Sequence, residues 1–300
     1  GADDRRPGPP ARCHGRRVSD LTYGGLIELG SARLRQAGIE DAVRDARRLM
    51  LLASKLESAG LIARENDVPT AQVIEAFEAM LQMRLERMPL AHIAGQTEFY
   101  GLTLRTDSRA LIPRADSEIV VDLALGLLPE DGCHIADLGA GTGALLVAIL
   151  AERPKATGVA GEASAEATAL ALENVESLGL ADQADVFQGV WSDWSGWSSC
   201  DLIISNPPYI CSAVIPTLAP EVRDFDPMSA LDGGPDGLDA YREITALAAD
   251  QMKSDAHLVF EIGFDQKLAV TTLLTEAGFV DLQHKQDLAG HDRAIAARKS

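Results

Sequence analysis

The run Asn206-Pro207-Pro208-Tyr209 contains the residue types needed to hold a planar amino group. It directly follows the apolar segment 201–205, which predicts a strand. The prolines have no N–H group to donate, so the turn offers carbonyl acceptors, and Asn206 Oδ1 adds another. Two such acceptors can take both hydrogens of an –NH₂ group while the ring of Tyr209 stacks on its plane. The motif therefore predicts a site that binds an amino group and aims its nitrogen lone pair in one direction.

A glycine-rich loop is the second candidate site. Asp137-Leu138-Gly139-Ala140-Gly141 joins a predicted strand, 133–137, to a predicted helix, 143–152. Glycines let a ligand approach the backbone, and the helix N-terminus presents free N–H groups. A dinucleotide fingerprint has its last glycine at the position of Ala144 but also accepts alanine there, so a dinucleotide stays open. Asp137 favours a cofactor with a cationic end, such as S-adenosylmethionine (AdoMet).

One acidic residue, Glu162, lies at the end of the next predicted strand, 156–162. It follows the glycine loop at the spacing of about 20 residues seen for ribose-binding acids in such folds. A carboxylate at this position can accept hydrogen bonds from both hydroxyls of a ribose. Because NAD and AdoMet both contain a ribose, Glu162 is consistent with either cofactor.

Strand and helix patterns alternate from residue 115 to the end of the chain. This alternation predicts an α/β fold with a mostly parallel, seven-stranded sheet and helices on both faces. Ligands bind at the carboxyl ends of such strands, so the glycine loop, Glu162 and Asn206 are expected to lie close together. Only the short segment 288–292 separates the last two strands, which predicts an antiparallel pair. The predicted strands are 133–137, 156–162, 185–189, 201–205, 257–263, 280–287 and 293–298, and the predicted helices include 115–128, 143–152, 165–178 and 238–253.

Three segments precede the α/β domain, which covers residues 115–300. Residues 1–18 are rich in Arg, Pro and Gly and are expected to be a disordered leader or an expression remnant. In 19–88, apolar residues recur at three- and four-residue spacing, which predicts a small helical bundle as a separate domain. Residues 89–114 mix glycines with short apolar runs and predict a β-hairpin linker.

Composition and charge narrow the class of protein. Of the 300 residues, 46% are hydrophobic and 24% charged, which predicts a globular chain. No apolar run reaches the roughly 18 residues that a membrane span needs. The formal net charge is −18, and residues 115–300 contain 10 basic and 30 acidic side chains, which argues against tight nucleic-acid binding. The four cysteines and six histidines show no metal-binding spacing, so we expect no metal and reduced thiols, as in a cytoplasmic protein.

Several ordered motifs together resemble one family. Asn-Pro-Pro-Tyr is typical of AdoMet-dependent methyltransferases that act on the amino groups of glutamine amides, adenine or guanine. Five more runs accompany it in this chain: Glu98 to Gly101, the run 111–118, the run 230–238, Glu261-Ile262-Gly263, and the run 287–293. In this order, over about residues 20–298, the chain resembles the HemK/PrmC family, the release-factor glutamine N5-methyltransferases.

The resemblance implies a fold, a cofactor and a substrate. It implies a class I, Rossmann-like methyltransferase domain over 115–300 and a helical substrate-docking domain over 19–88. It implies that AdoMet is bound by Asp137, Leu138, Gly139, Ala140 and Gly141, by Glu162 at the ribose, by Trp191 beside the adenine, and by Asn206. It further implies that the substrate is the glutamine of the Gly-Gly-Gln motif of peptide-chain release factors, bound by Asn206, Pro207, Pro208 and Tyr209, with Asn206, Pro207 and Tyr209 as catalytic residues. We expect a cytoplasmic monomer whose partner is the release factor, with no tight nucleic-acid binding and no membrane association.

The chain departs from the family pattern at three places, and three other functions stay open. Ala115 stands where the family favours proline, Val190 where aspartate commonly precedes the aromatic residue, and Gly161-Glu162-Ala163-Ser164 where a run of the Val-Asp-Ile-Ser type is usual. These differences bear on AdoMet affinity. A DNA or RNA amino-group methyltransferase would share the motif 206–209. A non-catalytic scaffold that binds AdoMet or a release factor would be consistent with Val190 and Ala115, and an NAD oxidoreductase would explain only the glycine loop.

Overall fold

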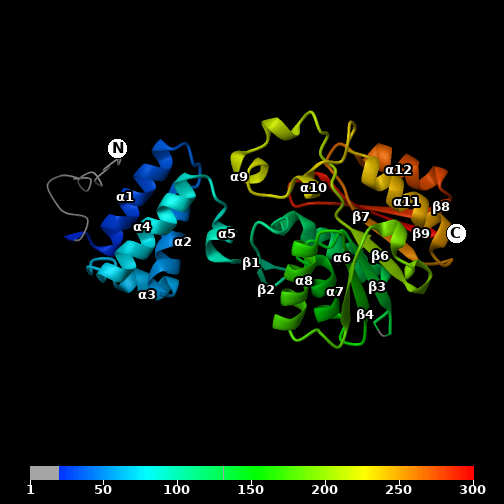
Figure 1. Ribbon diagram of the computed structural model, residues 1–300, viewed down its shortest axis with the longest axis horizontal. Helices are drawn as coiled ribbons and strands as arrows, with labels where there is room; N and C mark the ends of the chain where they lie inside the picture. Colours follow the sequence, from blue (N-terminus) through cyan, green and yellow to red (C-terminus); the bar gives the residue numbers. More distant parts are fainter. Residues whose placement is uncertain (1–19, 131) are drawn as a thin grey trace, which may run out of the picture. The chain divides into compact units, whose positions relative to one another are not determined.

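A computed structural model of the protein describes residues 20–130 and 132–300, so the predicted leader 1–18 lies outside the described residues. The chain divides into two compact units at the Ala94–Gly95 boundary (Figure 1). The helical unit contains the described residues up to Ala94, and the sheet unit contains those from Gly95 to Ser300. In the described part of the chain, no helix has the length and apolar character needed to cross a membrane.

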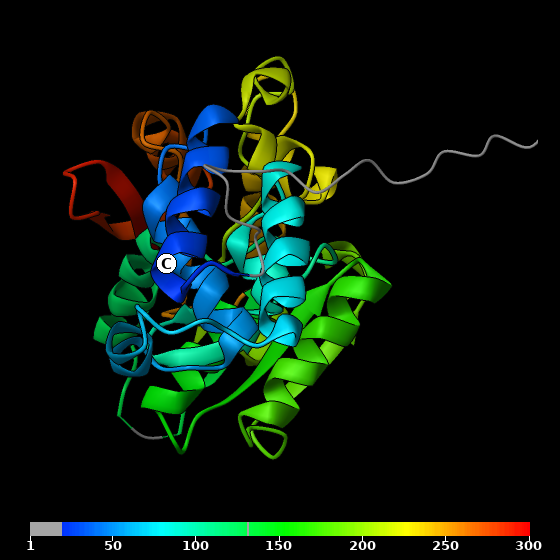
Figure 2. The same cartoon turned by 90° about the vertical axis from the view of Figure 1, so that its left-hand side faces the viewer.

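The helical unit has its own apolar core. Its helices are α1 (Tyr23–Gln36), α2 (Ala42–Ser54), α3 (Ser58–Ala63), α4 (Ala71–Leu85) and α5 (Leu90–Ala94). The side chains of Thr22 and Thr70 accept backbone N–H groups of the first turns of α1 and α4, which fixes where these helices begin. Helices α1, α2 and α4 pack side by side (Figure 2), and Leu26, Leu49 and Phe77 are fully buried in the core.

A β-hairpin opens the sheet unit. Its strands β1 (Gln96–Phe99) and β2 (Leu102–Arg105) pair antiparallel, and Phe99 is buried in the core of the sheet unit. The sequence predicts a hairpin linker over 89–114. In the structure, the start of that range forms α5 in the helical unit, and the hairpin belongs to the sheet unit.

The central sheet has seven strands, and five of them are parallel, which confirms the predicted fold class. The strands are β3 (His134–Leu138), β4 (Thr157–Glu162), β5 (Ala184–Gln188), β6 (Leu202–Ser205), β7 (His257–Glu261), β8 (Phe279–Gln286) and β9 (Asp292–Lys299). Their order is β5-β4-β3-β6-β7-β9-β8. Strand β9 runs antiparallel to both β7 and β8, so the predicted antiparallel pair closes one end of the sheet.

Two helical layers cover the two faces of the sheet (Figure 1). The principal covering helices are α6 (Glu118–Leu127), α7 (Ala144–Glu152), α8 (Ala165–Ser177), α11 (Asp239–Gln251) and α12 (Lys267–Glu276). Successive residues of a strand point to opposite faces. On β6, Leu202 and Ile204 therefore belong to the apolar layer of α6, α7 and α8, whereas Ile203 belongs to the layer of α11 and α12.

The strand order reverses between β3 and β6. From β3 the chain continues to β4 and β5 on one side, and from β6 it continues to β7 on the other. Loops that leave such a pair of strands diverge and open a crevice, where ligands bind in α/β sheets. The glycine loop leaves β3, and the connection 206–238, which contains the short helices α9 (Pro220–Arg223) and α10 (Met228–Leu231), leaves β6. The topology thus brings the two predicted motifs together.

Candidate active site

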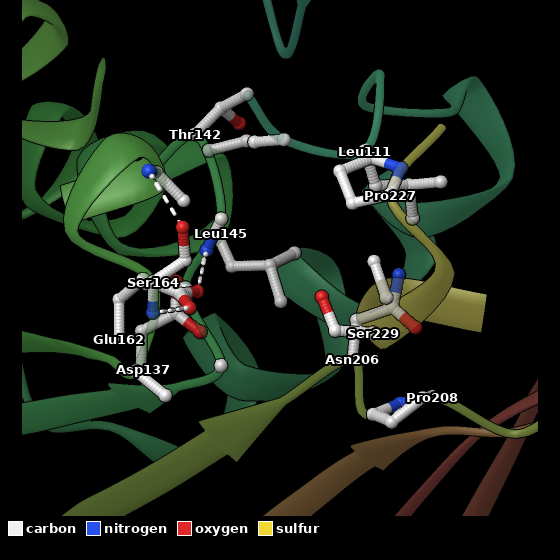
Figure 3. Close-up of a pocket in the computed structure, with 18 of the residues that line it drawn as sticks. Leu111, Asp137, Thr142, Leu145, Glu162, Ser164, Asn206, Pro208, Pro227 and Ser229 are labelled. Atoms are coloured by element: carbon white, nitrogen blue, oxygen red, sulfur yellow. Dashed lines mark hydrogen bonds between the residues drawn. The ribbon is translucent and has the colours of Figure 1, made fainter. Parts of the chain in front are cut away.

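A cavity of about 320 Å³ opens at the carboxyl ends of β3, β4 and β6. Small-molecule sites usually measure about 300–1,000 Å³. Figure 3 shows Asp137 and Glu162 on one side of the cavity, with Asn206, Pro208 and Ser229 on the other. Of the predicted site residues, the cavity brings together Asp137, Gly139, Ala140, Gly141, Glu162, Trp191, Asn206 and Pro208. Leu138, Pro207 and Tyr209 are not among the residues that line it.

The glycine loop adopts a backbone conformation that other residues rarely take. Gly139 and Gly141 have φ angles of 72° and 55°. The N–H groups of Gly139 and Ala140 donate to the carbonyl of Gly161, at 2.8 and 3.1 Å, which fixes the loop against β4. A Cβ atom on Gly139 would lie 3.7 Å from the ring of Trp191. The glycine thus keeps the backbone open to a ligand beside that ring.

Asp137 is a buried carboxylate with a free oxygen. It is 1% exposed; Oδ2 accepts the N–H of Leu146 at 3.3 Å, and Oδ1 has no hydrogen-bond partner among the described residues. Burial raises the pKa of Asp137 to about 7, the Leu146 N–H opposes the shift, and the charge of Glu162 adds to it. A cationic ligand group beside Oδ1 would favour the charged carboxylate. This free acceptor fits the ammonium end of AdoMet.

Glu162 uses both of its carboxylate oxygens within the protein. Oε2 accepts the N–H of Gly141 and Oε1 accepts the N–H of Ser164, each at 2.9 Å. A carboxylate has about four acceptor positions, so it can bind ribose hydroxyls in addition. Glu162 therefore joins the glycine loop to the start of α8 and also presents an acceptor to the cavity.

Trp191 places an indole ring at the cavity wall. It begins a short 3₁₀ helix, Trp191–Asp193, after β5. Its carbonyl accepts the indole N–H of the fully buried Trp197 at 3.3 Å, which anchors the turn to the core. Val190, where the family commonly has aspartate, is half exposed and also lines the cavity. The indole ring of Trp191 thus lines the same cavity as the glycine loop and Glu162.

Asn206 presents an unpaired amide to the cavity. The hydroxyl of Ser205, at the end of β6, donates to the carbonyl of Leu138 at 2.5 Å and ties β6 to β3. Among the described residues, none is hydrogen-bonded to the half-buried side chain of Asn206. Pro208 lines the cavity next to it (Figure 3). An amide carbonyl without an internal donor is available to accept an N–H group from a substrate.

Tyr209 lies behind the cavity wall that Asn206 and Pro208 form. Its ring packs against the apolar layer of α11 and α12, and its carbonyl accepts a hydrogen bond from Gln266 Nε2 at 3.0 Å. Burial, together with the charge of Glu261, raises the pKa of Tyr209 to about 12. Glu261 ends β7 at 3% exposure, and burial raises its pKa to about 7. A second buried carboxylate, that of Glu261, thus lies near the turn 206–209.

Two loops complete the cavity wall with residues that were not among the predicted site residues. Leu111 and Pro113 line the cavity from the segment after the hairpin, and Pro227 and Ser229 line it from the connection 206–238. Strand–helix connections are usually about 2–6 residues long. The unusual length of 206–238 is therefore the sequence signal that could have identified the second loop.

An ion pair joins these two loops. Arg114 Nη2 lies 2.9 Å from Asp226 Oδ2, and the side chain of Asp226 is fully buried. Burial raises the pKa of Asp226, and the guanidinium of Arg114 opposes the shift. Asp226 Oδ1 has no hydrogen-bond partner within the described ranges. The ion pair thus connects the loop that contains Pro227 to the segment that contains Pro113.

Asn174, on α8, also supports the site without lining it. It is fully buried, and its Nδ2 donates to the carbonyl of Thr142 at 2.9 Å and to that of Arg105 at 3.1 Å. Its Oδ1 accepts the N–H of Arg105 at 2.7 Å. One side chain therefore ties the glycine loop to β2. Nothing in the spacing of the sequence indicates this contact.

Two family models match the chain. A model described as the PrmC N-terminal domain matches residues 26–95, and one described as the methyltransferase small domain matches residues 119–217. The first match covers most of the helical unit. The second runs from α6 past the turn 206–209 and includes the glycine loop and Glu162.

A solved structure is similar in fold to this chain. The catalytic domain of hMettl16, solved in complex with the MAT2A 3′UTR hairpin 6, superposes with a TM-score of 0.52. It is 14% identical to this chain and covers 76% of this chain and 82% of its own. At this identity the likeness concerns the fold alone.

Curated relatives match over nearly the whole chain. The release factor glutamine methyltransferase of Caulobacter vibrioides is 39% identical over 272 residues, which are 89% of this chain and 93% of the relative. That of Bradyrhizobium diazoefficiens is 43% identical over 293 residues, 94% of this chain and 98% of the relative. That of Rhodospirillum rubrum is 37% identical over 299 residues, 100% of this chain and 91% of the relative. At this identity and coverage, the chain belongs to the release factor glutamine methyltransferase family.

Proposed function

We propose that the protein transfers a methyl group from AdoMet to the side-chain amide nitrogen, N5, of the glutamine in the Gly-Gly-Gln motif of peptide-chain release factors. The observation that carries this proposal is the amide of Asn206, which lines the cavity with no hydrogen-bond partner among the described residues. The names of the relatives supply the release factor and the glutamine. The acceptors at Asp137 and Glu162 fit the cofactor.

Three groups of this chain would hold the cofactor. Asp137 Oδ1 would accept from the ammonium end, Glu162 would accept from the ribose hydroxyls, and Trp191 would contact the adenine. When bound, AdoMet supplies a methyl group activated by attachment to a positively charged sulfur. The positive φ angles of Gly139 and Gly141 leave the loop backbone open beside it.

The protein activates the amide mainly by positioning it. An amide nitrogen is a poor nucleophile because its lone pair is delocalised into the carbonyl. Asn206 Oδ1 and the carbonyl of Pro207 accept the two N–H groups and so orient the nitrogen toward the methyl group. Such orientation lowers the barrier by several kcal/mol, up to about 7–11 kcal/mol in ideal systems. The same acceptors stabilise the positive charge that develops on the nitrogen, and the alkylated amide is acidic enough to release its proton without a strong base.

The proposed partner is a protein, the release factor, and the reaction takes place where release factors act. We propose that the helical unit helps to dock the release factor, because it has a separate core and exposes the apolar side chains of Val43, Ile62 and Val68. Because the proposed substrate is a release factor, we propose that the enzyme acts in the cytoplasm. We expect no tight binding to nucleic acid.

The other functions considered from the sequence are less consistent with the site. An NAD oxidoreductase leaves Asn206 and Pro208 at the cavity wall without a role. A non-catalytic scaffold has no need of an unpaired amide acceptor beside the cofactor site. A nucleic-acid methyltransferase shares the turn, yet the acidic balance of residues 115–300 disfavours a phosphate backbone.

Methyl transfer from labelled AdoMet to a purified release factor tests the proposal. The wild-type protein is expected to label the factor, and a factor whose motif glutamine is replaced by alanine is the matched control. Mass spectrometry of the labelled factor should place one methyl group on that glutamine. Equal labelling of both factors, or labelling of neither, would contradict the proposed function.

A further inference from the structure

A loop without regular secondary structure lies against the glycine loop, and the proposed mechanism gives it no role. It comprises residues 107–113, shortly after the end of β2, and is called the covering loop below. Ala110, in the middle of the covering loop, is buried against Ala167 and Leu170 of α8. A Cβ atom on Gly141 would lie 3.7 Å from the Cβ of Ala110, so the covering loop approaches the glycine loop closely.

The covering loop also forms part of the cavity wall. Arg109, Ala110, Leu111 and Pro113 all line the cavity. A cofactor in the cavity is therefore bounded by the glycine loop on one side and by the covering loop on another. How firmly the covering loop is held thus bears on how long the cofactor stays bound.

The backbone of the covering loop does little to fix it. The N–H of Ala110 donates to the carbonyl of Asp107 at 3.4 Å, which is longer than the usual distance of about 2.9–3.0 Å. Just before the loop, the N–H of Thr106 donates to the carbonyl of Gly95 at 3.2 Å. Side-chain contacts are therefore expected to determine where the covering loop lies.

Arg109 makes these contacts, and it pairs with two carboxylates at once. Its Nε and Nη2 donate to Oδ1 and Oδ2 of Asp107 at 2.9 and 2.8 Å. Its Nη1 and Nη2 donate to Oε1 and Oε2 of Glu173, on α8, at 2.8 and 3.2 Å. Two-point pairing of a guanidinium with a carboxylate gives strong and directional hydrogen bonds. The next residue of α8, Asn174, donates to the carbonyl of Thr142, so adjacent residues of one helix hold the two loops that bound the cavity.

We propose that Arg109 is a positioning residue for the cofactor: its guanidinium fastens the covering loop to α8 through Glu173 and so slows the release of AdoMet from the cavity. The inference rests on AdoMet as the cofactor of the proposed function and does not depend on the methyl acceptor. Each nitrogen of the guanidinium already donates to Asp107 or Glu173, so Arg109 acts by holding the loop. The side chains of Arg109 and Glu173 are 27% and 36% exposed, and ion pairs at such exposure contribute modestly, so the effect on the rate is several-fold.

Release of labelled AdoMet from the full-length chain, chased by excess unlabelled AdoMet, tests this role without a release factor. We expect Arg109→Ala and Glu173→Ala each to accelerate release by about three- to tenfold. Arg109→Lys should accelerate it less, because an ammonium keeps the charge but loses the two-point geometry. The double alanine variant should release AdoMet no faster than the quicker single variant, because both changes break the same contact. In the protein without AdoMet, amide hydrogens of the covering loop should exchange faster in both single variants.

Arg298→Ala is the matched control. Arg298 also bridges two carboxylates, with Nη1 2.6 Å from Asp255 Oδ1 and Nη2 2.6 Å from Asp281 Oδ2, and its side chain is 30% exposed. It pairs with His257, the first residue of β7, and so lies at the edge of the sheet opposite the cavity. Its loss should lower the melting temperature about as much as the loss of Arg109 and leave AdoMet release unchanged.

Thermal unfolding of each variant separates lost stability from faster release. A wild-type release rate in Arg109→Ala, an acceleration of the same size in Arg298→Ala, or single effects that multiply in the double variant would each overturn the inference. A wild-type protein that binds AdoMet and shows the expected changes in its variants, but methylates no release factor, would instead overturn the proposed function.

Discussion

Asn206 is the residue at which cofactor binding and turnover should separate most clearly. Its side chain has no partner among the described residues, so removing it leaves no internal group unsatisfied. We expect Asn206→Ala to lower kcat/KM for the release factor by at least about 100-fold, the scale of one lost charge-stabilising contact. AdoMet affinity should stay within a few fold. Single-turnover methylation and calorimetry measure the two quantities.

Asn206→Asp provides the comparison for this prediction. Aspartate keeps an acceptor in the same place and adds a charge, so it should retain more activity than alanine. If the alanine variant matched the wild type, the proposed amide-holding mechanism would be wrong even though the family assignment stands.

Asp137 makes AdoMet binding depend on pH. Burial raises its pKa to about 7, so the carboxylate is largely protonated at pH 6 and largely charged at pH 8. A cationic group beside Oδ1 binds the charged form better. AdoMet affinity should therefore rise, by up to about tenfold, as pH increases from about 6 to about 8. Calorimetric titration across this range measures the change.

The control is Asp137→Asn, which cannot ionise. It should bind AdoMet more weakly than the wild type at pH 8 and show a much flatter pH dependence. A wild-type affinity that is constant from pH 6 to 8, or that falls with pH, contradicts the role given to Asp137.

The sequence identifies those site residues whose position follows from a strand end. Asp137, Glu162 and Asn206 each lie at or just after the carboxyl end of a parallel strand, and all three line the cavity. Tyr209, a predicted substrate-binding residue, packs against the apolar layer of α11 and α12, a contact that is not predictable because residue types do not give the direction of a turn. The Arg114–Asp226 pair could not be predicted either, because its partners are 112 positions apart.

At the scale of elements, Glu162 joins β4 to the glycine loop and to α8. Glu162→Ala removes an acceptor from the ribose and also releases the N–H of Gly141. We expect AdoMet binding to weaken by about 1.5–3 kcal/mol, the range for a hydrogen bond to a charged group. Calorimetry on the purified variant measures this change. Glu166→Ala is the control, because Glu166 is an exposed acidic residue in the first turn of α8. An unchanged affinity in Glu162→Ala would remove the ribose assignment.

The ion pair between Arg114 and Asp226 joins two loops of the cavity wall. Arg114→Ala leaves the fully buried carboxylate of Asp226 without its counter-charge, so stability should fall by about 1–3 kcal/mol. Adding Asp226→Asn should recover part of this loss, because a neutral amide needs no counter-charge. Urea denaturation gives the free energies of unfolding. A double variant whose loss equals the sum of the two single losses would show that the pair is not coupled.

Strands and long helices could be predicted because their apolar periodicity reflects burial. Strands β3 to β9 lie within one or two residues of their predicted ranges, and so do the ends of α7 and α8. The short helices α9 and α10 follow no such period, and packing within the connection 206–238 sets them. The hairpin belongs to the sheet unit because Phe99 is buried in that core, a long-range contact that local pattern does not contain.

At the scale of the whole molecule, charge is distributed unevenly. Residues 115–300 contain 10 basic and 30 acidic side chains, whereas the formal net charge of the entire chain is −18. The acidic segment includes most of the cavity lining, so the surroundings of the site repel a phosphate backbone at long range. A protein substrate brings no such backbone and is not subject to this repulsion.

The free protein should consequently bind duplex DNA weakly. Non-specific binding by DNA-binding proteins reaches dissociation constants of about 10⁻⁴–10⁻⁶ M at physiological salt because Lys and Arg displace counterions from the phosphates. With the cavity in an acidic segment, we expect no saturable binding at micromolar protein, measured by fluorescence anisotropy of a labelled duplex at about 0.15 M salt. A titration at lower salt is the control. Salt screens the repulsion between the acidic protein and the phosphates less at low concentration, so binding should weaken further there. Micromolar or tighter binding that strengthens as salt falls would indicate a basic contact surface and would favour a nucleic acid as the substrate.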